Sequence, residues 1–159
     1  MKPFSMALIL VALTCSSALA AEAPVGKGLL ATLRAARPEV RWDASTLVVA
    51  DLNGDGSPDA AAVGYSKNGI VLAVGVSSGK GTLTIQYLDF SISASIEAAI
   101  CGAPAHLSAV PLSCNSDGDT LPGCREASTT AGLFLSGGDC DPINLYWNYD
   151  EHHIAWWRN

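Results

Sequence analysis

Positive charge is scarce in this sequence of 159 residues. Lysine and arginine number nine against 15 aspartates and glutamates, which gives a formal net charge of −6. The basic residues form no stripe. This argues against a nucleic-acid partner and an anionic membrane surface, because both bind clustered cations. The acidic balance favours cations or a basic protein as partners.

Long hydrophobic runs are also absent. The longest, residues 6–13, contains eight apolar residues, whereas a helix that spans a membrane needs about 20. Lys2 precedes this run and Ala18-Leu19-Ala20 follows it, which is the pattern of a secretory signal with a small-x-small cleavage site. The sequence therefore predicts a cleaved signal peptide over residues 1–20. A lipid anchor on Cys15 is the alternative, disfavoured by the large Thr14 before it.

The expected mature chain, residues 21–159, is long enough for one domain with one hydrophobic core. Only Lys2 is lost with the signal, so eight basic residues face 15 acidic ones and the net charge becomes −7. We expect this domain to be periplasmic or secreted, without a membrane span.

No C-x-x-C pair occurs, which disfavours a zinc site. The mature chain has four cysteines, an even number that in an exported protein predicts two disulfides. Three pairings are open from the sequence. We favour Cys114–Cys124, which would close a turn-rich loop over residues 115–123, with Cys101–Cys140 as the longer crosslink.

Recognised catalytic motifs are missing as well. Residues 75–79 match the Gly-x-Ser-x-Gly pattern, but they join two expected strands, whereas a nucleophile elbow leads from a strand into a helix. Residues 75–82 resemble a phosphate-binding loop only superficially, because Gly81 stands where Ser or Thr should follow Lys80. The sequence predicts no catalytic residue.

The periodicity of apolar residues predicts a β-rich α+β fold. Leu29, Leu30 and Leu33 fall on one face of a helix expected over residues 27–36, after a linker over residues 21–28. Strands are expected next, separated by short turns that favour an antiparallel meander. Their ranges are 46–50, 60–65, 70–76 and 82–88.

The second half of the chain is less regular. Ile92, Ile96 and Ile100 recur every four residues, which favours a short helix within residues 91–111. Further on, a strand is expected over 130–136. A terminal hairpin is expected from strands 143–149 and 154–158.

One acidic loop carries recognisable chemistry. Over residues 51–59, oxygen-bearing side chains stand at positions 1, 3, 5 and 9, and calcium prefers six to eight oxygen ligands. Gly54 and Gly56 permit a tight curl. The predicted metal ligands are Asp51, Asn53, Asp55, the Ser57 carbonyl and Asp59. A metal-free hairpin turn is the alternative, whereas an EF-hand is disfavoured because Ala62 occupies position 12.

The segment 48–59, Val-Val-Ala-Asp-Leu-Asn-Gly-Asp-Gly-Ser-Pro-Asp, resembles the calcium loop of FG-GAP/VCBS-type repeats, the blade unit of integrin-like β-propellers. The resemblance covers about residues 47–76 and implies a calcium-binding connection between two strands. Complete propellers carry several such repeats, and this chain has one clear copy. A looser resemblance, through residues 145–149, is to small exported proteins of unknown or inhibitor-like role.

Aromatic residues gather near the end of the sequence. Trp147, Tyr149, Trp156 and Trp157 are candidate partner-binding residues, because exposed aromatic side chains anchor interfaces. The alternative is that one face of the hairpin packs inside and the other covers a sheet edge.

These observations predict an exported calcium-binding protein that acts as a protein-binding module, of inhibitor or immunity type, with another exported protein as its partner. A calcium-dependent hydrolase and a structural accessory module of the cell envelope are the alternatives. A binder should present a flat or convex patch, and an enzyme a deep cleft with converging polar groups.

Overall fold

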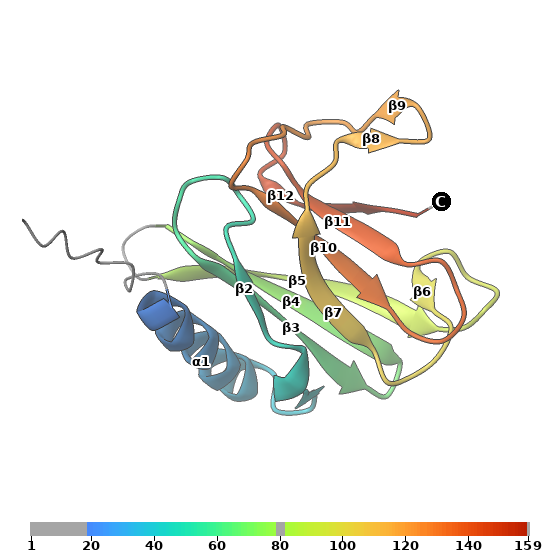
Figure 1. Ribbon diagram of the computed structural model, residues 1–159. Coiled ribbons are helices and arrows are strands. Elements are labelled where there is room, and N and C mark those ends of the chain that lie inside the picture. Colours follow the sequence, from blue (N-terminus) through green and yellow to red (C-terminus); the bar gives the residue numbers. More distant parts are fainter. Residues whose placement is uncertain (1–18, 79–81, 159) are drawn as a thin grey trace, which may run out of the picture.

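The computed structural model describes residues 19–78 and 82–158, and shows one α-helix and two main sheets in three layers (Figure 1). The helix α1 (Leu19–Ala36) packs on one face of the larger sheet, and the smaller sheet packs on the other. Of the predicted signal peptide, residues 1–20, the first 18 lie outside the described residues. No helix in the described part of the chain is long and apolar enough to cross a membrane.

The larger sheet has the order β1-β3-β4-β5-β6, with β2 also paired to β3. Its strands are β1 (Arg41–Trp42), β2 (Val48–Ala50), β3 (Asp59–Ser66), β4 (Gly69–Ser77), β5 (Leu83–Ile92) and β6 (Ala99–Ile100). A 3-10 turn, η1 (Ala44–Thr46), joins β1 to β2. Strands β2 to β5 pair antiparallel in chain order, as the meander prediction requires.

The smaller sheet has the order β12-β11-β10-β7. Its strands are β7 (His106–Pro111), β10 (Ala131–Ser136), β11 (Ile143–Asn148) and β12 (His153–Trp157). The predicted terminal hairpin is confirmed by the antiparallel pairing of β11 and β12. Within the predicted loop 115–123, β8 (Asn115–Ser116) and β9 (Asp119–Thr120) form a small two-stranded ribbon.

The centre of the larger sheet, strands β3 and β4, is buried on both faces. In β3, Ala60 and Ala62 face the helix, while Ala61 and Val63 face the smaller sheet. Small side chains on the helix side allow close packing: a Cβ placed on Gly75 would lie 2.9 Å from Leu29 Cδ1. All nine residues of β4 are buried, which explains why this strand reads as a continuous apolar run.

The helix begins earlier than the sequence predicts. Residues 21–28, predicted as a linker, belong to α1, although Pro24 and two glycines lower the helix propensity of this segment. Packing accounts for the difference. Val25 joins the cluster between helix and sheet, and Gly26 approaches Leu47 so closely that a Cβ there would lie 2.7 Å from its Cδ2.

The short helix expected from Ile92, Ile96 and Ile100 is wrong. After β5 the chain turns back and pairs β6 in parallel with the end of β5. Ile92 and Ile96 are 43% and 50% exposed, and only Ile100 is buried. The four-residue spacing therefore reflects no common buried face.

Both favoured disulfides are confirmed. Cys114–Cys124 and Cys101–Cys140 form bridges with sequence separations of 10 and 39. Together with the helix, the meander and the terminal hairpin, they match the predicted fold class.

Side chains join the two main sheets along one side. The amide of Gln86 on β5 accepts from Ile154 N at 2.8 Å and donates to His152 O at 3.3 Å. Just beyond β12, Arg158 donates to the backbone carbonyls of Glu97 and Ala99, at 2.9 and 2.6 Å. The edge-to-face pair of Phe90 and Trp156, whose ring centroids are 5.8 Å apart, also joins β5 to β12.

Candidate functional site

The acidic loop connects β2 to β3, and the register pair Ala50–Asp59 closes it. Its first and fifth positions each carry a carboxylate that organises the backbone. Asp51 Oδ1 accepts from Gly54 N at 2.7 Å and Asp51 Oδ2 from Gly56 N at 3.0 Å. Asp55 Oδ1 accepts from Ser57 N at 2.7 Å. These bonds explain why acidic residues at odd positions curl the loop.

Asn53 continues the same pattern. Its Oδ1 accepts from Asp55 N at 3.0 Å, and its Nδ2 donates to Asp55 Oδ2 at 3.2 Å. The curl needs left-handed backbone at Gly54 and Gly56, with φ of 72° and 80°, a conformation that glycine adopts without strain.

Asp59 differs from the other acidic residues of the loop, since it is fully buried. Its Oδ2 accepts from Leu52 N at 2.9 Å and Asn53 N at 3.3 Å, and its Oδ1 accepts from Ser77 N at 2.7 Å. Burial raises the pKa of this carboxyl to about 6, and the nearby charge of Asp55 adds to the rise, against the opposing effect of the three N–H donors. Asp59 therefore ties the start of the loop to the end of β4.

Some of the predicted ligands in the acidic loop suit a calcium ion and others do not. Among the described residues, no three Asp, Glu, His or Cys side chains lie close enough to hold a metal on those groups alone. A cation in this loop would depend on the carboxylates of Asp51 and Asp55, the Asn53 amide oxygen and the Ser57 carbonyl. Such a mixed oxygen set is usual for calcium. Asp59 would contribute least, because it is fully buried and its two oxygens together accept three backbone hydrogen bonds.

The acidic loop also contacts the smaller sheet. Ala131 N donates to Asp51 O at 2.8 Å, and Leu52 enters the core between the sheets. A Cβ placed on Gly54 would lie 2.6 Å from Tyr149 Oη and 2.8 Å from Thr130 Oγ1. The loop is thus a joint between the two sheets, packed beneath side chains of the second.

The aromatic residues of the terminal hairpin do not share one surface. Trp147 is buried in the core, and Trp156 packs against the same core beside Phe90. Tyr149 covers the acidic loop. Trp157 points to the outer face of the smaller sheet, where it lines a hollow of about 60 Å³ with Val110, Leu112 and Tyr146. Of the four predicted partner-binding residues, Trp157 alone lies on this outer face.

The Cys114–Cys124 loop borders that outer face. Leu121 within it is buried, and Pro122 O accepts a hydrogen bond from Tyr146 Oη at 3.0 Å. The loop therefore covers one end of β11 and leaves Val110, Phe134 and Trp157 half-buried beside it.

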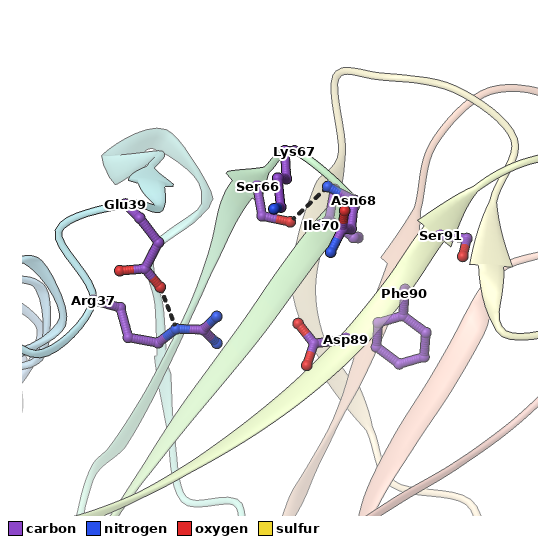
Figure 2. A pocket seen from close by; sticks show the side chains of 9 residues that line it. All are labelled: Arg37, Glu39, Ser66, Lys67, Asn68, Ile70, Asp89, Phe90 and Ser91. Carbon is purple, nitrogen blue, oxygen red and sulfur yellow. Dashed lines mark hydrogen bonds and ion pairs between the residues drawn. The ribbon is translucent and has the colours of Figure 1, made fainter.

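A second site was not predicted from the sequence. A cavity of about 620 Å³ opens where the segment after α1, the β3–β4 turn and the end of β5 meet (Figure 2). It is lined by Arg37, Glu39, Ser66, Lys67, Asn68, Ile70, Asp89, Phe90 and Ser91. No local motif marks these residues, because three segments distant in sequence supply them.

The comparisons with known proteins add no assignment: no family model matches the chain, and no curated protein or solved structure matches it either.

Proposed function

We propose that this chain is an exported, calcium-stabilised protein-binding module. The observation that carries the proposal is the position of the acidic loop: it bears two solvent-accessible carboxylates and forms the joint between the two sheets. A bound calcium ion would neutralise Asp51 and Asp55 and crosslink the loop. The residues already curl it through Asp51, Asn53 and Asp55 and pack it beneath Tyr149.

The binding surface in this proposal is the outer face of the smaller sheet. In the described part of the chain, no helix covers this face, since α1 packs on the far side of the larger sheet (Figure 1). Trp157, Phe134, Val110 and Leu112 are partly exposed there. A flat apolar patch with an aromatic anchor, on a chain of net charge −6, fits another exported protein with a basic rim around its contact surface. The chain would act as an inhibitor or immunity protein by covering the contact surface of that partner.

Calcium is tested by thermal unfolding of the mature chain with excess calcium and with chelator. At a calcium concentration 100 times its Kd, a single site stabilises the fold by about 2.7 kcal/mol, and the melting temperature should rise. Asp55→Asn should abolish the rise, because it removes one of the charges that attract calcium. The asparagine keeps an oxygen that can accept from Ser57 N, so the loop should stay folded. Asp117→Asn, in the β8–β9 turn, is the matched control and should retain the rise. An identical melting curve with chelator and with calcium would exclude a stabilising calcium ion.

The partner is tested by affinity capture from the cell envelope with the wild type and two variants. We expect a stoichiometric partner that Trp157→Ser fails to retain. Ile96→Ser, which alters an exposed apolar residue elsewhere, should still retain it. Absence of a stoichiometric partner, or equal loss with both variants, would contradict the binding-module proposal.

A further inference from the structure

The cavity between α1 and the β3–β4 turn presents opposite charges that face each other. In Figure 2 the guanidinium group of Arg37 and the carboxylate of Asp89 point toward one another across the open middle. No ion pair joins them among the described residues; Arg37 pairs with Glu39 instead, at 2.9 Å. Lys67 stands on the turn at the rim and likewise has no ion-pair partner in the described part of the chain.

Arg37 is held in place from two sides. Its Nε donates to Glu39 Oε1 at 2.9 Å, and its guanidinium carbon lies 5.3 Å from the centroid of the Tyr87 ring. Its terminal Nη groups make no hydrogen bond within the described residues. A guanidinium fixed through Nε and the ring face retains the pair of N–H groups that binds a carboxylate in two parallel hydrogen bonds.

Asp89 is placed by the strand register. It lies two residues after Tyr87 on β5, so both side chains project from the same face of the sheet. Its register partner is Val71, which packs toward the helix. The exposed carboxylate therefore lies beyond the end of the helix, on the side of the sheet where Arg37 lies.

We infer that this cavity binds a small zwitterion, of the size of a free amino acid or a dipeptide. The ligand carboxylate would lie on the Nη groups of Arg37 near Lys67, and its ammonium group on Asp89. Arg37 and Lys67 balance Glu39 and Asp89, so the four charges sum to zero. A ligand with one charge would engage only half of this arrangement, whereas a zwitterion engages both halves.

The remaining lining suits the body of such a ligand. Ser66, Asn68 and Ser91 supply hydroxyl and amide groups for a peptide bond, whereas the side chains of Ile70 and Phe90 are buried in the core on the other face of the sheet. A volume of about 620 Å³ lies in the range of small-molecule sites, roughly 300–1,000 Å³. The inference is independent of the acidic loop and of the outer face of the smaller sheet.

Calorimetric titration of the mature chain with leucyl-leucine tests it, beside the N-acetylated and the C-amidated forms of this dipeptide. We expect binding of the free dipeptide, weakened about tenfold by either modification, because each removes one charge-assisted contact. Arg37→Gln should weaken binding of the free dipeptide about as much as amidation weakens wild-type binding. Arg34→Gln, which alters a nearby arginine outside the cavity, should have no effect.

The decisive comparison combines ligand and variant. In Asp89→Asn the N-acetylated and free dipeptides should bind equally, because the partner of the ammonium group is gone. No detectable binding of the dipeptide to the wild type would overturn the inference. So would a full acetylation penalty that persists in Asp89→Asn, or equal weakening by Arg34→Gln and Arg37→Gln. The comparison of free, acetylated and amidated dipeptides on the wild type leaves the protein unchanged, so its outcome does not depend on the stability of any variant.

Discussion

Two loops of this molecule are held in one conformation by different kinds of bond. The acidic loop is held by hydrogen bonds from its own side chains to its own backbone, at Asp51, Asn53 and Asp55. The loop between Cys114 and Cys124 is closed by a covalent bond, and backbone pairing of β8 with β9 orders the chain within it. The spacing of side chains encodes the hydrogen bonds of the first loop, whereas the sequence alone leaves the cysteine pairing of the second open.

The largest expected effect concerns the covalent side of this comparison. Replacing Cys101 and Cys140 together by alanine should lower the free energy of unfolding by about 4 kcal/mol, because the unfolded chain gains much conformational entropy when a crosslink across so long a loop is lost. The same change at Cys114 and Cys124 should cost about 3 kcal/mol, since that loop is shorter. Urea unfolding measures both. A larger cost for the shorter loop would show that native contacts, rather than chain entropy, decide the order.

The next effect tests the hydrogen-bonded loop at its buried end. Asp59→Ala should cost about 3 kcal/mol, because it leaves the N–H groups of Leu52, Asn53 and Ser77 without this acceptor in a buried site. Asp43→Ala is the control: Asp43 caps η1 at the surface by accepting from Ser45 N, and its loss should cost clearly less than the loss of Asp59. Equal costs in urea unfolding would mean that burial of Asp59 adds nothing to its role.

A smaller effect separates the curl of the acidic loop from its packing. Gly54→Ala should cost about 2 kcal/mol, since both the left-handed backbone and the contact with Tyr149 Oη oppose a Cβ. Gly56→Ala should cost about 1 kcal/mol, because the backbone is left-handed there too but no atom lies within 4 Å of the new Cβ. Thermal unfolding of the two variants gives the difference. Equal values would indicate that the contact beneath Tyr149 is not tight in solution.

The smallest expected effect lies where the smaller sheet covers the acidic loop. Thr130 is buried, and its Oγ1 has no hydrogen-bond partner among the described residues. Thr130→Val should therefore raise the free energy of unfolding by up to about 1 kcal/mol. Thr32→Val, which alters an exposed hydroxyl on α1, is the control and should change stability little. Destabilisation by Thr130→Val would show that the hydroxyl does have a partner in solution.

The sequence predicted best where a side chain acts on its own neighbourhood. Short apolar runs bounded by turns located β3, β4 and the β11–β12 hairpin, and the spacing of Asp51, Asn53 and Asp55 predicted a tightly curled loop. These features need only the burial of a short strand or hydrogen bonds across two to five residues. The favoured disulfide pairing was also confirmed, although nothing in the sequence excluded the two other pairings.

Prediction failed where tertiary packing decides. The start of α1 depends on Val25 and Gly26 meeting the sheet, which overrides the low helix propensity of that segment. Ile92, Ile96 and Ile100 carry a helical spacing that the parallel pairing of β5 and β6 replaces. The cavity of Arg37 and Asp89 cannot be predicted from local sequence patterns, because it forms only when α1, the β3–β4 turn and β5 are packed together.

The contacts of Gln86 and Arg158 have a consequence for association. The last strand of a sheet presents free N–H and C=O groups that can pair with another chain and extend the sheet into an aggregate. Here the side-chain amide of Gln86 occupies such groups at Ile154 and His152, while Arg158 fastens the chain just beyond that strand to the other sheet. Gln86 thus occupies the His152–Ile154 end of this edge, which shortens the stretch of β12 backbone that another chain could pair with.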